Sequence, residues 1–357
     1  MPIQGFTRLR RHLFGRQFVY GTKVPATRAY PFSGVPTNEL NWTDPEVDTG
    51  SLDPTAAPYR VGADLTADLT SPSLAYNDAA LIFAAFFGGG EAPTGGGDAK
   101  TWTWHPASQT VDDRDVFTYE FGDDVVTDWF QLGDGILESF ELTGPEGLGP
   151  LEASMSWRFG SFASTGSTDS PADGGVPQDL TVAVDDPYIF LKDGGIYIAD
   201  TVAGLDAGQV TDALHTFTLR GSQELDLKRF ANGDQSFDID AYGPGARTIE
   251  LECTWAKTSD TVGTGSESDD WTSDEAVTRY VSLRFVSTAV AQSPSTFYGL
   301  TLTMPMRYYT REEGDIGGNT TVILTGHAFF DPDDFDGVFE AVLVNTLTDA
   351  ELGLMTS

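Results

Sequence analysis

Short runs of alternating apolar and polar residues recur along most of this chain. Ile249-Glu250-Leu251-Glu252-Cys253 is one such run, and Val281-Ser282-Leu283-Arg284-Phe285 is another. A period of two places successive side chains on opposite faces of a β-strand. Glycine, proline and aspartate separate the runs at short intervals, as turns between strands do. The pattern therefore predicts a mainly β fold built from many short strands.

One segment has a helical pattern instead. Residues 74–87 are rich in alanine, leucine and phenylalanine and contain no helix breaker, and Gly88-Gly89-Gly90 follows them directly. Ser71-Pro72-Ser73 supplies residue types that favour a helix start. Because the apolar positions of this segment are spread widely around a helix, we expect the helix to be buried against a sheet.

Two passages of the chain resemble two later ones in the same order. Residues 137–144 and 214–221 share the pattern L-x-x-F-x-L-x-G, and residues 152–157 and 250–255 both begin with Glu and end with Trp. Repeated passages in a conserved order indicate internal duplication, although chance similarity between amphipathic strands would look the same. The duplication predicts two tandem β-sandwich or half-barrel cores at 40–204 and 205–357, with a flanking helix in the first copy or in each.

The charge is large and uneven. The chain of 357 residues carries a net charge of −34, but residues 1–30 contain six basic side chains and no acidic one. This distribution predicts a basic, extended N-terminal arm over residues 1–39 on an acidic body. Such a body repels nucleic acid phosphates and anionic membranes. Solubility or adaptation to high salt explains the acidity equally well.

The sequence offers no catalytic or metal-binding pattern. The four histidines have no second histidine or cysteine at ligand spacing, and the single cysteine, Cys253, lies in a strand-like run where a small buried side chain fits. No apolar stretch is long enough to cross a membrane. We therefore expect a protein that is not an enzyme, binds no cofactor or metal and does not enter a membrane.

The order of these features resembles a known family. An arm precedes a strand, a buried helix and the Trp-rich segment Thr101-Trp102-Thr103-Trp104, and the β-unit that contains Phe140 then returns later in the chain. The segments Tyr298 to Pro305 and Phe329-Phe330-Asp331 follow near the end. Over roughly residues 40–345, this order is similar to that of the tail tube (major tail) proteins of siphophages.

The resemblance implies a structural virion protein of the phage tail, assembled in the host cytoplasm. Its copies would form stacked rings, as trimers with pseudo-hexameric symmetry or as hexamers, and DNA would pass through the lumen without specific binding. Other tail proteins (tape measure, tail terminator and tail tip) would be its partners. The expected inter-ring contacts are Arg8, Arg10, Arg11 and Arg16, and the expected lumen-facing acids are Glu138, Glu141, Glu152, Glu250 and Glu252.

Three alternatives remain open from the sequence. A capsid decoration or tail-tip protein would share the β-rich composition. A secreted β-sandwich that binds or hydrolyses carbohydrate would need a signal peptide, and no apolar core of such a signal follows the N-terminal arginines. A halophilic protein of unrelated function would share the acidity and would fold only at high salt.

Overall fold

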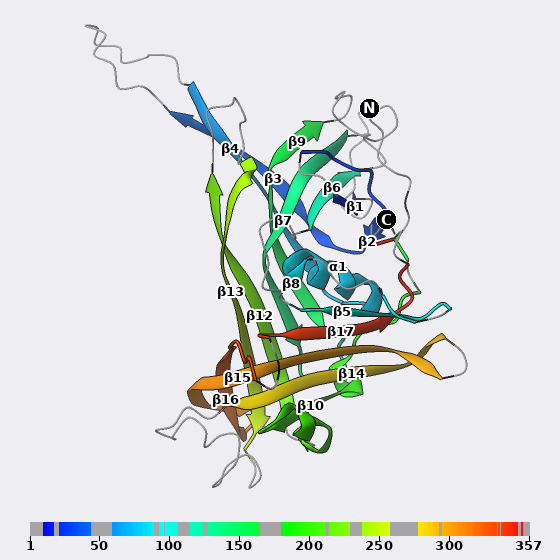
Figure 1. The fold of residues 1–357 in the computed structure, drawn as a ribbon, viewed down its shortest axis with the longest axis vertical. Helices are drawn as coiled ribbons and strands as arrows, with labels where there is room; N and C mark the ends of the chain where they lie inside the picture. Colours follow the sequence, from blue (N-terminus) through cyan, green and yellow to red (C-terminus); the bar gives the residue numbers. More distant parts are fainter. Residues whose placement is uncertain are drawn as a thin grey trace, which may run out of the picture.

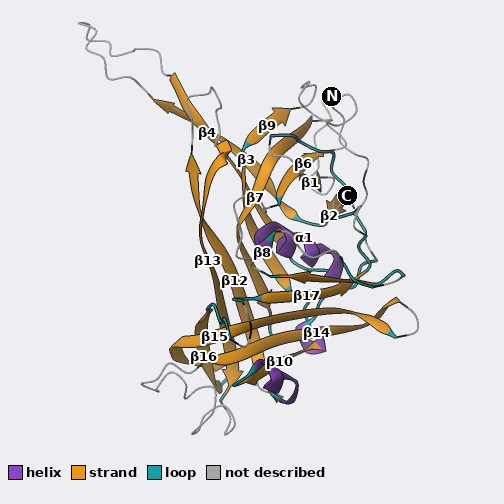
Figure 2. Cartoon of the chain, in the orientation of Figure 1, coloured by secondary structure: helices purple, strands orange, loops and turns teal. Residues whose placement is uncertain are grey.

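The computed structural model confirms a mainly β fold (Figure 1, Figure 2). It describes residues 10–17, 21–43, 59–88, 93–95, 97–105, 115–123, 128–164, 180, 182–183, 185–210, 214–228, 238–257, 278–292, 295–333, 335, 337–348 and 351–352. The strands are β1 (Arg10–Gln17), β2 (Arg28–Tyr30), β3 (Ser33–Thr43), β4 (Tyr59–Ser71), β5 (Lys100–Trp104), β6 (Val116–Asp123), β7 (Asp128–Gly144), β8 (Glu152–Phe159), β9 (Ser161–Ser164), β10 (Gly194–Ala199), β11 (Gln209–Val210), β12 (Leu214–Lys228), β13 (Asp238–Ala256), β14 (Arg279–Gln292), β15 (Thr296–Ile316), β16 (Asn319–Ala328) and β17 (Glu340–Asn345). The helical segments are α1 (Tyr76–Phe87) and the 3-10 turns η4 (Leu191–Asp193) and η5 (Val202–Ala207).

Eight strands form one continuous antiparallel sheet, here called the central sheet. Their order is β3–β4–β8–β7–β12–β13–β16–β15. The first four strands come from the first half of the chain and the last four from the second half. Within the central sheet, the halves meet at the β7–β12 pair, in which Leu142 lies opposite Leu219. In Figure 1, β12 and β13 run along the long axis of the molecule.

Two long strands leave the central sheet and enter outer sheets. The N-terminal part of β7 pairs with β6 and β9, and the outer sheet continues through β1 to β2. The N-terminal part of β15 pairs in the same way with β14 and β17, and that sheet continues through β10 to β11. Each half therefore has a central four-strand part and an outer part that are joined by one bent strand.

These pairings define an internal repeat in which the strands correspond in chain order. The equivalent pairs are β1 and β10, β2 and β11, β3 and β12, β4 and β13, β6 and β14, β7 and β15, β8 and β16, and β9 and β17. An irregularity supports this assignment, because the β7–β8 ladder shifts between Leu137 and Ser139 and the β15–β16 ladder shifts between Tyr308 and Thr310. Conserved bulges are typical of related β-structures.

The sequence patterns had indicated different equivalent strands. Residues 137–144 of β7 and 214–221 of β12 are not repeats of each other in this arrangement, since they are direct neighbours that pair antiparallel. Their shared pattern has a packing cause. A Cβ atom on Gly221 would lie 2.2 Å from the Phe140 ring, and one on Gly144 would lie 2.3 Å from the Phe217 ring. Each phenylalanine covers the glycine of the other strand.

The repeat begins earlier than the predicted second core at residue 205. Strand β10, at Gly194–Ala199, pairs with β14 of the second half. A further strand pairing crosses between the halves, because β5 of the first half pairs with β17 of the second. A single cluster of buried side chains extends through both halves.

Helix α1 is buried along its whole length, as predicted. The rings of Phe83 and Phe86 pack edge-on against Phe140 of β7, and Phe87 stacks on Phe339 near β17. Gly88, with φ 70°, ends the helix and donates its backbone N–H to Ala84. A counterpart in the second half would follow β13, where residues 258–277 lie outside the described part of the chain.

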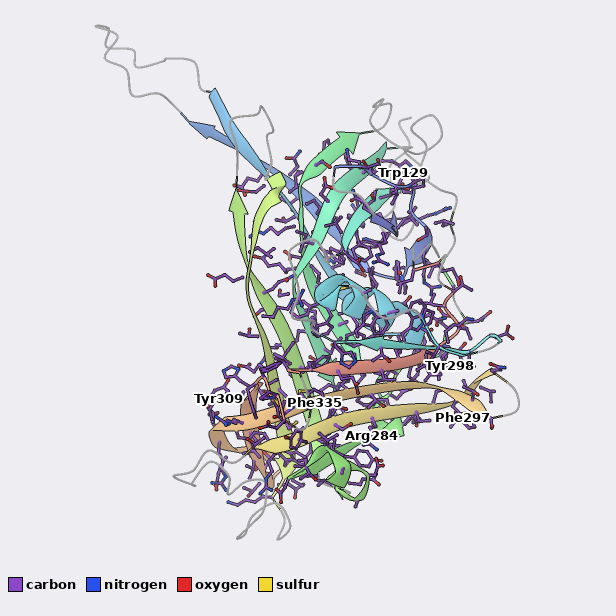
Figure 3. All side chains as sticks on the ribbon, in the orientation of Figure 1. Trp129, Arg284, Phe297, Tyr298, Tyr309 and Phe335 are labelled. Atoms are coloured by element: carbon purple, nitrogen blue, oxygen red, sulfur yellow. The ribbon has the colours of Figure 1, made fainter. Side chains whose placement is uncertain are left out.

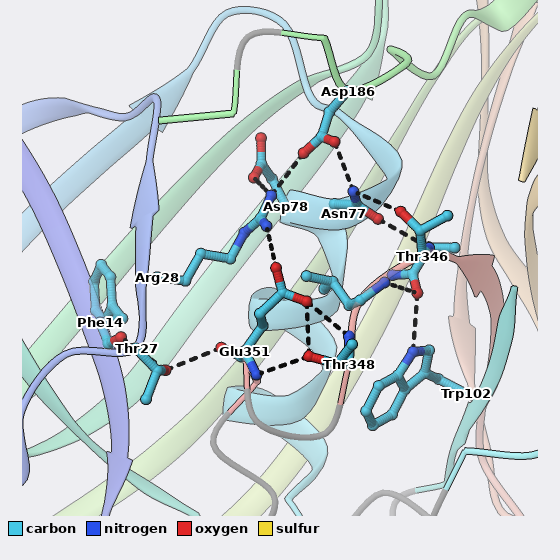
Figure 4. A network of polar contacts seen from close by, with 12 residues as sticks. Phe14, Thr27, Arg28, Asn77, Asp78, Trp102, Asp186, Thr346, Thr348 and Glu351 are labelled. Atoms are coloured by element: carbon cyan, nitrogen blue, oxygen red, sulfur yellow. Dashed lines mark hydrogen bonds and ion pairs between the residues drawn. The ribbon is translucent and has the colours of Figure 1, made fainter. Parts of the chain in front are cut away.

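A buried polar network anchors α1 to distant segments (Figure 4). The Arg28 guanidinium donates to Asp186 at 2.6 Å and to Asp78 at 3.4 Å, and Asn77 donates to Asp186 at 2.7 Å. Burial, with repulsion from Asp186, raises the pKa of Asp78 to about 6, although Arg28 acts in the opposite direction. The network connects β2, α1 and the segment before β10.

Within the predicted extended arm (1–39), residues 10–17, 28–30 and 33–39 form strands. Strand β1 pairs with β2 and with β6, and β3 forms one edge of the central sheet. Leu13 and Phe14 are almost fully buried, at 0% and 2% exposure. The apolar side chains within the basic segment therefore hold it in the fold. Residues 1–9, with Arg8, lie outside the described residues.

Candidate functional site: the polar face of the central sheet

The two faces of the central sheet differ in character. One face packs into the core through side chains such as Leu69, Met155, Leu219 and Cys253. The other is a polar face with an open groove of about 590 Å³. Its polar lining residues come from six neighbouring strands and are Asp68, Thr70, Ser139, Glu141, Ser154, Ser156, Arg220, Ser222, Thr248, Glu250 and His327. Alternation along each strand produces this separation.

Arg220 of β12 is the centre of the charged groups on this face. It lies directly opposite Glu141 of β7 on one side and Glu250 of β13 on the other. Its Nε donates to Glu141 Oε2 at 2.8 Å, and its Nη1 donates to Glu250 Oε1 at 3.0 Å and to Glu252 Oε2 at 3.4 Å. One guanidinium thus partly neutralises three carboxylates, and these bonds raise the pKa of Arg220.

The β15–β16 end of the sheet adds an aromatic pair, of which Tyr309 is labelled in Figure 3. The Tyr309 hydroxyl donates to Glu250 Oε2 at 2.6 Å, and the Tyr309 ring stacks on His327 with centroids 4.3 Å apart. The bond from Tyr309, with the bond and the charge of Arg220, lowers the pKa of Glu250. Desolvation and the same bond to Glu250 raise the pKa of Tyr309 to about 12. Glu250 therefore stays ionised at neutral pH.

The face keeps a negative excess despite its arginines. Arg158 Nε donates to Glu138 Oε2 at 2.9 Å, and Ser156 donates to Asp68 at 2.6 Å. With Glu152, which is exposed on β8, six of its carboxylates outnumber the guanidinium groups of Arg158 and Arg220.

The five acids predicted from the sequence all belong to this face. Glu138, Glu141, Glu250 and Glu252 bind its two arginines, and Glu152 lies two residues before Ser154 on the same side of β8. The predicted alternation of Glu250 and Glu252 with buried residues is confirmed, since Ile249, Leu251 and Cys253 are at most 1% exposed.

The basic residues predicted as inter-ring contacts lie elsewhere. Arg10, Arg11 and Arg16 belong to β1 in the outer sheet. Arg16 forms an ion pair with Asp115, Arg11 donates to the Leu180 carbonyl at 3.1 Å, and Arg10 lies over the Phe121 ring. These three arginines therefore already interact with groups of their own chain. Their role in contacts between rings stays a prediction.

Four further residues of this face were not predicted from the sequence: Arg158, Arg220, Tyr309 and His327. A signal for Arg220 exists, because it alternates with the apolar positions 217 and 219 of its strand. Its partners could not be derived, since the register between strands far apart in sequence depends on tertiary packing.

The central sheet has two edges that lack a neighbouring strand among the described residues. One is the outer side of β3, which pairs only with β4. The other is the C-terminal part of β15, where residues 307–316 pair only with β16. Because all eight strands are antiparallel and their number is even, the two edge strands run in opposite directions. They therefore have the polarity that an antiparallel pair requires.

Other chemistry is sparse on the described residues. They contain no group of three or more histidine, cysteine, aspartate or glutamate side chains that could hold a metal ion. Cys253 is buried, and burial raises the pKa of its thiol, as expected for a core side chain. Among the described residues, no helix is long and apolar enough to cross a membrane.

Comparisons with known proteins give a distant likeness among solved structures. No family model and no curated protein matches the chain. Among solved structures, the chain is similar to the tail tube of SPP1, determined by solid-state NMR and cryo-EM, with a TM-score of 0.29 and 16% sequence identity. The match covers 47% of this chain and 87% of the SPP1 chain.

Proposed function

We propose that this protein is a structural subunit of a phage tail tube, in which copies of the chain close their central sheets into a ring. The observation that carries the proposal is the central sheet itself. It is a wall with one apolar face covered by the outer layer, one polar face, and two open edges of opposite direction. Long open edges promote pairing with other chains, and closure into a barrel removes both.

The internal repeat sets the expected symmetry. Each chain supplies two equivalent wall units, so three chains would give a ring of six units, with the β7–β12 contact inside each chain. The alternative is six chains in a wider ring. Rings would stack into a tube, with tape measure, terminator and tip proteins as partners in a virion assembled in the host cytoplasm.

In this ring the polar face lines the lumen. Its carboxylates would repel phosphates over about 8–10 Å at physiological ionic strength, which suits a passage for DNA without specific binding. Arg220 and Arg158 hold four of these carboxylates in place and lower the repulsion between neighbouring strands. The proposal assigns a structural role and no catalytic residue.

Electron microscopy of the purified chain over a range of protein concentrations tests this proposal. We expect rings or short tubes, which form because edge pairing is favoured by mass action. The same series at low and high salt is the control, because a halophilic protein would fold only at high salt. A folded chain that stays monomeric under all these conditions would contradict the proposal.

A further inference from the structure

The repeat in this chain carries a residue-level prediction for the contact between copies. We infer that the edge strand β15 of one copy pairs with β3 of the next in the register of the internal β7–β12 ladder. This inference rests on the proposed ring and specifies the interface from which it is built. Its basis is that β15 corresponds to β7 and β3 corresponds to β12 in chain order.

The bulges fix the correspondence between β7 and β15. Leu137 and Ser139 flank the shift in the β7–β8 ladder, and Tyr308 and Thr310 flank the shift in the β15–β16 ladder. Counting onward from the bulges aligns Glu141 with Glu312, and Thr143 with Gly314. The contacts at the bulge are also equivalent. Glu138 bonds Arg158 across the first ladder, and the corresponding residues Tyr309 and His327 stack across the second.

The ladders of the neighbouring hairpins fix the correspondence between β12 and β3. Arg220 lies opposite Glu250, and Glu250 lies opposite His327. Thr37 occupies the same place in the first half, since it lies opposite Thr66, which pairs with Arg158. Thr37 therefore corresponds to Arg220, and Val35 corresponds to Thr218.

The internal ladder has six residue pairs, from Phe217–Gly144 to Ser222–Ser139. Transferring it to the open edges gives a specific ladder between copies. The predicted opposite residues are Gly34 and Asp315, Val35 and Gly314, Pro36 and Glu313, Thr37 and Glu312, Asn38 and Arg311, and Glu39 and Thr310.

The charges of the two edges are compatible with this register. Glu39, Glu312 and Glu313 face Thr310, Thr37 and Pro36, so no carboxylate lies directly opposite another. A shift of β15 by two residues against β3 keeps every side chain on its face of the sheet. The alternation of polar and apolar residues alone therefore does not exclude such a shift. One of the two such shifts would place Glu39 opposite Glu312, where like charges destabilise the pair.

Disulfide trapping in the full chain tests the register. In the double variant Thr37→Cys/Glu312→Cys, we expect oxidation to give chains cross-linked to one another, seen on non-reducing gels, because opposite strand residues lie within disulfide reach. The matched control is Val35→Cys/Thr310→Cys, whose two positions are four residues out of register and about 13 Å apart along the strands. Chains of this variant should not become cross-linked on oxidation. Thr143→Cys/Thr218→Cys joins directly opposite residues of the internal β7–β12 ladder and should close a disulfide within one chain, detected as a loss of free thiols. Cys253 is buried and remains as a constant background.

The outcomes separate this inference from the proposed function. Rings in the microscope without the Thr37–Glu312 cross-link, or with the out-of-register cross-link, overturn the register and leave the ring. The expected cross-link in open filaments supports the register and contradicts the closed ring. Chains that neither cross-link nor assemble overturn both.

Discussion

At the scale of single residues, the polar face depends on the charge balance around Arg220. Glu141, Glu250 and Glu252 share this one guanidinium, whose side chain is 41% exposed. Exposed ion pairs contribute little individually, but removing the shared cation would leave three carboxylates in mutual repulsion on adjacent strands. Arg220 therefore affects stability mainly because it reduces the repulsion between these three carboxylates.

We expect Arg220→Met to lower the free energy of unfolding by about 1 kcal/mol at pH 7. Tyr309 and Arg220 hold the pKa of Glu250 below its unfolded value, so the stabilisation that they give is present above that value and is lost as the pH falls through the folded pKa. The difference between variant and wild type should therefore disappear below about pH 4. Urea unfolding at several pH values measures it.

Lys192→Met is the control for the Arg220 variant, because Lys192 is an exposed cation paired with one carboxylate, Asp193. Its effect should be smaller at pH 7 and should depend less on pH. An Arg220 variant whose loss of stability is the same at pH 4 and pH 7 would contradict the electrostatic account.

At the scale of elements, local alternation predicted which residues share a face, and tertiary packing decided which strands are equivalent. The period of two is a local property, so the side of Glu250 and Glu252 followed from the sequence. The repeat did not, because the similar patterns in β7 and β12 arise where Phe140 and Phe217 each cover a glycine of the other strand. A shared pattern can thus mark two strands that pack on each other.

Gly221→Ala tests this packing. The new methyl group would meet the buried Phe140 ring, which α1 holds through Phe83 and Phe86. We expect a loss of about 1–3 kcal/mol, the usual cost of overpacking a core. The matched control is Gly299→Ala in β15, where the nearest atom would be 3.6 Å away. Chemical denaturation compares the two, and equal stabilities would contradict the reciprocal packing.

At the scale of the whole molecule, the two repeats share a sheet and a buried core. Strand β5 of the first repeat pairs with β17 of the second, and α1 packs against side chains from both. The sequence could not predict the β5–β17 pairing, because the pattern around β5 is typical of an ordinary hairpin strand of the first half. The duplicated chain is therefore not expected to behave as two independent domains.

Division of the chain at the repeat boundary tests this unity. We expect residues 1–193 alone to lack cooperative unfolding, since β5 would lose its partner and α1 would expose part of its apolar surface to water. Co-expression with residues 194–357 should restore a stable complex, because the β7–β12 ladder and the shared core reunite the halves. Thermal unfolding followed by circular dichroism, together with co-purification of the fragments, measures both effects. A sharp, independent transition for residues 1–193 alone would show that the repeats are autonomous and that the shared core is not required for folding.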